Sequence, residues 1–166
     1  MSLKHIFTLF LIACLQPAMA QSLSGVESVE YDPVNNQYLT SADGSSIVAI
    51  APNGALSYFG SGLLADYGME VVNGTLFTVA GSTIKGYSLS TATEVMSHPI
   101  AGAGFLNGMG NNGADKLWVS DFSTKKIIEV DISNLNSPSS SVVVANTVST
   151  PNGIVYDGAN NRILFV

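Results

Sequence analysis

The chain has 166 residues, a length that suits one domain of ordinary size. Only 11% of the residues are charged, 46% are hydrophobic and 16 are glycine. This composition excludes a helical bundle rich in Ala, Glu and Lys, and it excludes a disordered chain. The chain has twelve acidic and six basic residues, so its formal net charge is −6. A negative surface without a basic cluster argues against nucleic acid or an anionic membrane as a partner, and it is compatible with a metal cation or a neutral substrate.

The first twenty residues have the marks of a secretory signal peptide. Lys4 precedes an apolar run over residues 6–15, and a small-residue exit ends at Ala20. The apolar run is too short to span a bilayer as a stable helix. We therefore predict a signal peptide over residues 1–20 and a mature domain over residues 21–166 that is secreted or periplasmic. Without Lys4 the mature chain would carry five basic and twelve acidic residues, a net charge of −7.

Cys14 supports an alternative interpretation of the leader. Residues 11–14, Leu-Ile-Ala-Cys, resemble a bacterial lipoprotein box, in which the cysteine is lipidated and becomes the first residue. Pro17 and the small-residue exit favour simple secretion instead. Cys14 is the only cysteine, so removal of the leader would leave a domain without disulfides, a thiolate nucleophile or a Cys-based zinc site.

A repeat organises the chain from residue 28 onward. Predicted first strands start at residues 28, 68, 108 and 153, which are 40, 40 and 45 residues apart. Second strands are predicted at 38–41, 76–79, 117–120 and 163–166, third strands at 46–50, 83–87 and 126–130, and fourth strands at 56–59, 94–97 and 141–144. Four short strands in a period of about 40–45 residues are typical of a β-propeller blade. The sequence thus predicts an all-β fold, a β-propeller of four-stranded antiparallel blades.

Turn residues between the first two strands of each copy agree with this fold. They are Asn35-Asn36, Asn73-Gly74, Asn112-Gly113 and Asn160-Asn161. Asn and Gly tolerate the positive φ of tight hairpins. For the same reason we interpret the sequon Asn73-Gly74-Thr75 as a hairpin rather than a glycosylation site.

The second strand of each copy is the most apolar, as expected for a strand covered on both faces. The only tryptophan, Trp118, lies in this column, and we predict that it packs between blades rather than serving as a ligand platform. The chain stops at Val166 inside the second strand of the fourth copy. A propeller closes with about four to eight blades. We therefore expect a fragment of about three and a half blades, the N-terminal part of a propeller of about six.

Three polar residues stand just before predicted first strands: Glu27, Asn107 and Asn152. The first strand of a blade is innermost in a propeller, so residues at its start converge on the mouth of the central channel. Carboxylate and amide oxygens gathered there would suit a hard divalent cation such as Ca²⁺ or Mg²⁺. An Asn before Gly is also a common turn, and the residues alone leave both interpretations open.

Short motifs at these positions resemble the SMP-30/gluconolactonase/LRE-like family of six-bladed propellers. They are Val26-Glu27-Ser28-Val29-Glu30-Tyr31-Asp32, Leu106-Asn107-Gly108-Met109 and Pro151-Asn152-Gly153-Ile154. The resemblance implies that Glu27 and Asn152 bind a metal, with Ca²⁺ preferred over Mg²⁺ or Zn²⁺, and that Asn107 faces the substrate. It also implies a catalytic Asp beyond Val166, so the fragment alone should be inactive.

The resemblance implies a secreted metal-dependent, lactonase-like hydrolase that acts on a small-molecule substrate. One departure is that Asn107 is followed by Gly108-Met109-Gly110, where the family typically has an acidic residue. NHL-repeat propellers are near relatives, and the alternative function is a non-catalytic propeller that binds a protein or glycan. Asp66 is a second acidic candidate for the channel, although a turn role is favoured. His98, beside Pro99, is interpreted as a surface residue.

Overall fold

The computed structural model describes residues 23–42 and 45–166, so the predicted leader with Cys14 lies outside the described residues. The described chain consists of strands joined by turns and loops. Three sheets have four antiparallel strands each, and a fourth sheet has two. The first contains β1 (Ser28–Asp32), β2 (Gln37–Ala42), β3 (Ser46–Ile50) and β4 (Leu56–Tyr58); the second contains β5 (Met69–Val72), β6 (Thr75–Ala80), β7 (Thr83–Ser88) and β8 (Glu94–Pro99); the third contains β9 (Leu106–Asn111), β10 (Lys116–Asp121), β11 (Lys126–Asp131) and β12 (Ser139–Val144); the last contains β13 (Ile154–Asp157) and β14 (Arg162–Phe165).

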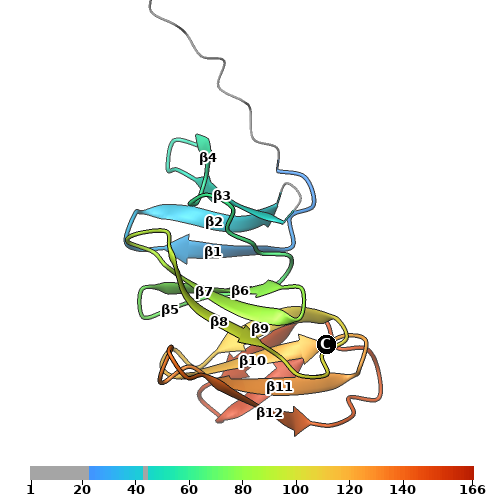
Figure 1. The fold of residues 1–166 in the computed structure, drawn as a ribbon. Helices are drawn as coiled ribbons and strands as arrows, with labels where there is room; N and C mark the ends of the chain where they lie inside the picture. The colour runs from blue at the N-terminus through green and yellow to red at the C-terminus, as the bar shows by residue number, and fades with distance from the viewer. Residues whose placement is uncertain (1–22, 43–44) are drawn as a thin grey trace, which may run out of the picture.

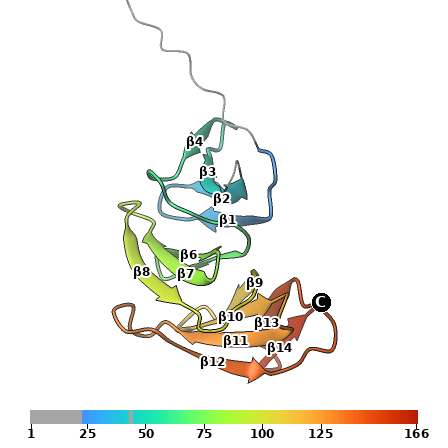
Figure 2. The same ribbon diagram turned by 45° about the vertical axis from the view of Figure 1, so that its right-hand side comes forward.

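The strands in each sheet pair in chain order, as in the blade of a propeller. Figures 1 and 2 show the sheets following one another through the molecule, and β13 lies beside β9. We number these sheets as blades one to four. The described chain therefore forms about three and a half blades, which confirms the predicted fold.

The strand boundaries agree with the predicted columns to within two residues. Three boundaries differ by two residues: β8 ends at Pro99 rather than at residue 97, and β9 begins at Leu106 rather than at residue 108. The third is that of β12, which begins at Ser139 rather than at residue 141. This strand is the outer edge of its blade and is exposed over most of its length. It therefore needs only its backbone pairing with β11, and serines without an apolar pattern suffice.

Hairpin turns between the first two strands show the backbone geometry that their residues favour. Asn36, Asn73 and Asn161 have φ values of 51°, 48° and 48°, and Gly74 has 77°. The hairpin interpretation of Asn73-Gly74 is confirmed, and the Asn73 amide also donates a 3.0 Å hydrogen bond to the Ala114 carbonyl of the next blade. The turns thus join strands within a blade and also connect neighbouring blades.

The hydrophobic core lies between blades. One cluster fills the space between blades one and two and includes Leu39, Ile47 and Leu76. A second fills the space between blades two and three and includes Phe77, Leu117 and Val130. Second strands contribute to both, because they lie mid-blade and are covered on both faces. Since each blade packs on the next, the sheets follow one another around their inner strands.

The inner strands run beside one another in the order β1, β5, β9 and β13, each in contact with the next. The order of pairing places each of these strands at the inner edge of its own sheet. The starts of these strands are therefore the part of the chain that positions the candidate site. The described residues contain no helix that is long and apolar enough to span a membrane.

Candidate functional site

Very close backbone contacts hold the starts of the inner strands together. The Gly68 N–H donates to the Asn107 carbonyl at 2.8 Å, and the Gly108 N–H donates to the Asn152 carbonyl at 3.1 Å. A Cβ on Gly68 would lie 2.6 Å from the Asn107 oxygen, and one on Gly108 would lie 2.2 Å from the Asn152 oxygen. Glycine is required at both positions because a side chain would collide with backbone of the next blade. We call this row of strand starts the mouth of the fragment.

The three predicted site residues all lie at the mouth. Glu27 immediately precedes β1, and Asn152 stands two residues before β13. Asn107 is the second residue of β9 rather than a residue before it, because β9 begins at Leu106. The side chains of Glu27 and Asn152 are exposed, while Asn107 is half-buried.

The backbones of these residues are fixed, but within the described residues their side chains form no hydrogen bond. The Glu27 N–H donates to the Ser41 carbonyl at 3.4 Å, and the carbonyls of Asn107 and Asn152 accept the two glycine N–H groups described above. The structure brings Asn107 next to Asn152 through Gly108, whereas β5 and β9 separate Glu27 from Asn152 in the row of inner strands. Within residues 23–42 and 45–166, no three His, Cys, Asp or Glu residues gather closely enough to hold a metal ion.

Asp66 lies at the same end of the blades but serves a turn. Its carboxylate accepts a 2.6 Å hydrogen bond from the Gly81 N–H in the β6–β7 hairpin, in agreement with the turn role that the sequence favours. Asp66 also lines an open hollow of about 570 Å³ together with Tyr67 and Phe105, whose rings meet edge to face at 4.7 Å.

Two glutamates on the inner strands form a second polar group that the sequence analysis did not single out. Glu30 of β1 accepts a 3.3 Å hydrogen bond from the Val71 N–H of the next blade, and Glu70 of β5 accepts one from the Asn111 side chain of the blade after that. Burial and, after it, the negative charge of Glu30 raise the pKa of Glu70 to about 7, although the hydrogen bond from Asn111 acts in the opposite direction. Burial also raises the pKa of Glu30.

A signal for this pair was present in the sequence. Glu30 and Glu70 occupy the same position of the repeat, 40 residues apart, whereas the third copy has Gly110 there. Because the side chains of one blade reach across to the next, a shared column of acidic residues places like charges on neighbouring strands. The two carboxylates therefore repel each other, which favours the protonated form of Glu70.

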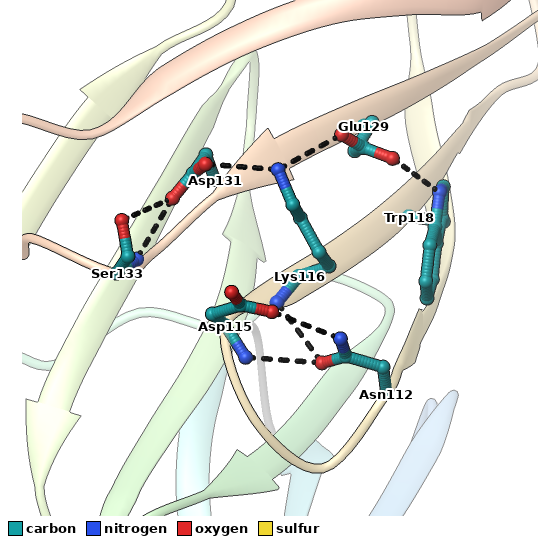
Figure 3. Close-up of polar contacts among 7 residues, drawn as sticks. All are labelled: Asn112, Asp115, Lys116, Trp118, Glu129, Asp131 and Ser133. Atoms are coloured by element: carbon teal, nitrogen blue, oxygen red, sulfur yellow. Dashed lines mark hydrogen bonds and ion pairs between the residues drawn. The ribbon is translucent and has the colours of Figure 1, made fainter.

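The opposite end of blade three carries a self-contained charge network, drawn in Figure 3. The Lys116 ammonium lies 2.8 Å from Asp131 and 3.1 Å from Glu129, and Glu129 also accepts the indole N–H of Trp118 at 3.2 Å. The hydrogen bond from Lys116 lowers the pKa of the Asp131 carboxyl well below its usual range. The side chains in this network are paired with one another and join β10 to β11.

Trp118 lies between blades, as the sequence predicted. The side chain is buried, and its ring stacks on Tyr156 of blade four with ring centroids 5.0 Å apart and an interplanar angle of 15°.

His98 also contacts another blade, because its Nε2 lies 3.0 Å from the Ser140 hydroxyl. His98 is half-buried at this contact, and burial lowers its pKa; the sequence did not predict the partner Ser140.

Comparison with known proteins supports the fold. The chain matches no family model, and it matches no curated protein. The chain is similar to three solved structures. A streptogramin B lyase structure matches 88% of the chain with a TM-score of 0.66 and 17% identity, and a nidogen/laminin complex matches 87% with a TM-score of 0.68 and 13% identity. The Cps50 (Swd1) β-propeller domain of Myceliophteria thermophila matches 86% with a TM-score of 0.66 and 11% identity. The chain spans 49%, 57% and 49% of those three chains, respectively.

These similarities and the stacked four-stranded sheets define the class of protein. The chain is part of a β-propeller, and its inner strands bring polar residues from successive blades to one end. Such low identities establish the fold alone, because propellers host both enzymes and binding proteins.

Proposed function

We propose that the chain is the N-terminal part of a secreted or periplasmic, metal-dependent hydrolase that acts on lactone or ester bonds, of the SMP-30/gluconolactonase type. The observation that carries the proposal is the contrast between the backbones and the side chains of Glu27, Asn107 and Asn152. Their backbones are held at one end of the inner strands, and their side chains form no hydrogen bond within the described residues. Side chains with fixed backbones and available oxygens are suited to bind a ligand.

The donor chemistry fits a hard divalent cation. Glu27 offers a carboxylate and Asn152 an amide oxygen, which are ligands that Ca²⁺ accepts readily, with Mg²⁺ and Zn²⁺ as alternatives. A bound cation would polarise a lactone carbonyl or acidify a water molecule. In this proposal Glu27 and Asn152 hold the cation, Asn107 orients the substrate from the neighbouring strand, and an Asp beyond Val166 serves as the base.

Cation binding and hydrolysis test the proposal separately. We expect CaCl₂ to raise the Tm of the full-length protein, because a ligand that binds only the folded state stabilises it. Glu27→Gln should abolish most of this rise, whereas Glu94→Gln, at an exposed glutamate of β8, should leave it intact. A panel of lactones and esters then tests turnover. A Tm that is unchanged by Ca²⁺, Mg²⁺ and Zn²⁺ would refute the metal-dependent function.

A second function, non-catalytic binding of a protein or glycan, is favoured by the outer face of blade one. Val29, Tyr31 and Tyr38 share this face and are 56%, 46% and 54% exposed, and the two tyrosine rings lie 5.4 Å apart. One similar structure is a nidogen/laminin complex. Exposed aromatic residues of this kind are typical of binding surfaces, although blade faces also pack against other blades. Two results together would favour this second function: a Tm that does not change with divalent cations, and binding of a protein or glycan that is lost in Tyr38→Ser.

A further inference from the structure

A buried serine hydroxyl joins two of the proposed site residues. Ser120 of β10 is 0% exposed. Its hydroxyl accepts a 2.8 Å hydrogen bond from the Gly108 N–H and donates a 2.6 Å hydrogen bond to the Asn152 carbonyl. Gly108 directly follows Asn107. One side chain from the middle of blade three therefore fixes the backbone beside Asn107 and the backbone of Asn152 in blade four.

Blade one contains the same arrangement. The hydroxyl of Ser41, a residue that is 1% exposed, accepts from the Ser28 N–H at 3.1 Å and donates to the Tyr67 carbonyl at 3.2 Å. In these two blades the serine links a residue at or near the start of its own inner strand to the residue two positions before the next inner strand. The repetition shows that the hydroxyl contact follows from the geometry of the repeat.

Blade two shows that packing of the blades does not require this hydroxyl. Val79 takes the equivalent position, and the Gly68 N–H bonds directly to the Asn107 carbonyl at 2.8 Å. Neighbouring inner strands therefore approach equally closely with an apolar residue there. The serine hydroxyl therefore has an effect other than bringing the blades into contact. In blade three it provides a second hydrogen-bond donor to the Asn152 carbonyl, beside the Gly108 N–H.

The extra donor completes the immobilisation of Asn152. Its N–H donates to the Val166 carbonyl at 2.6 Å, and its carbonyl accepts from both Gly108 and Ser120. Both backbone polar groups of Asn152 are thus held, while its side chain is exposed. A residue with this arrangement has its backbone orientation set by Ser120 and its amide group free to bind.

We propose that Ser120 is a positioning residue for the ligand-binding mouth, which holds Asn152 and the segment after Asn107 in the geometry that a divalent cation requires. This inference rests on the proposed function for the identity of the ligand. Ser120 does not touch the cation; it acts through the backbone of Asn152. Removal of residues that orient metal ligands typically costs about 10–100-fold in metal affinity.

The test compares Ser120→Ala with Thr78→Val in the full-length protein. Thr78 is an equally buried hydroxyl whose 2.7 Å bond goes to the Leu64 carbonyl, which is not a mouth residue. Calorimetric titration with Ca²⁺ alone is carried out at a temperature where both variants are fully folded. We expect Ser120→Ala to weaken Ca²⁺ affinity at least about tenfold and Thr78→Val to leave it unchanged. Equal affinity in Ser120→Ala and wild type, or an equal loss in both variants, would overturn the inference.

A second measurement on the cation-free protein separates failure of this inference from failure of the proposed function. Amide hydrogen exchange and ¹⁵N relaxation report on the Gly108 N–H and on the Asn152 backbone and side-chain amides. We expect Ser120→Ala to speed exchange at Gly108 and to increase motion at Asn152. If the wild type binds no cation but these changes occur, the metal function is wrong and the positioning role of Ser120 stands. If the wild type binds Ca²⁺ and these groups are unaffected in Ser120→Ala, the positioning role is wrong.

Discussion

Glu70 should contribute to a dependence of the stability of the propeller on pH, and Glu70→Gln should remove this contribution. Burial and the charge of Glu30 raise the pKa of Glu70 in the folded chain from its ordinary 4.5 to about 7. Between these two values the folded state binds a proton that the unfolded state has released. Stability therefore falls as pH rises through this window and stays constant above it.

The size of the effect follows from the width of the window. Each pH unit is worth about 1.4 kcal/mol, so the window from 4.5 to about 7 corresponds to about 3 kcal/mol. Glu70 is only half-buried, and solvent screening reduces this figure, so we expect about 1–2 kcal/mol. Glutamine keeps a side-chain oxygen that can accept the hydrogen bond from Asn111, and it carries no charge to repel Glu30.

Urea unfolding at pH 5 and pH 8 measures the effect. The stability of Glu70→Gln relative to wild type should increase by about 1–2 kcal/mol from pH 5 to pH 8. Glu94→Gln is the matched control. Its carboxylate is 44% exposed and pairs with Lys85 at the surface, so its relative stability should change by less than about 0.5 kcal/mol over the same range. An advantage of Glu70→Gln that is the same at both pH values would refute the assignment of a raised pKa to Glu70.

Two further predictions concern the packing of the inner strands and the contact between blades. Gly108→Ala should lower stability by about 1–3 kcal/mol in urea unfolding, because the new Cβ would lie 2.2 Å from the Asn152 oxygen. Gly153→Ala should be nearly neutral, because its Cβ meets only Val166, at 3.5 Å. Equal losses of stability in the two variants would contradict the close approach of Gly108 to Asn152. Tyr156→Leu should cost about 1 kcal/mol beyond its lost buried area and shift the fluorescence of the only tryptophan to the red, because the stacked ring over Trp118 is removed. Tyr38→Leu, on blade one, should leave that emission unchanged, and an unshifted spectrum in Tyr156→Leu would contradict the stacking.

The repeat made most of the fold predictable from the sequence. Its spacing, its Asn and Gly turns and its apolar second strands are local features, and local features decide which segments form strands and hairpins. The strand columns and the position of Trp118 between blades were predicted for this reason. The least accurate boundaries, each two residues off, were the end of β8, the start of β9 and the start of β12, an exposed edge strand whose serines carry no apolar pattern.

The candidate site was predictable only in part. Glu27, Asn107 and Asn152 could be placed at the starts of inner strands because each has a fixed position in the repeat. The pairing of His98 with Ser140 and the acceptance of the Asn111 amide by Glu70 each join residues about 40 positions apart in neighbouring blades. Sequence spacing alone does not give the direction in which such side chains point.

The sequence by itself determined that this chain forms short strands in successive four-stranded sheets, because turn chemistry and strand periodicity act between residues that are close in the chain. The tertiary structure alone decided which polar groups meet. The hydroxyl of Ser120 reaches Asn152, and burial shifts the pKa of Glu70, because stacking of the blades brings distant segments together and removes them from water.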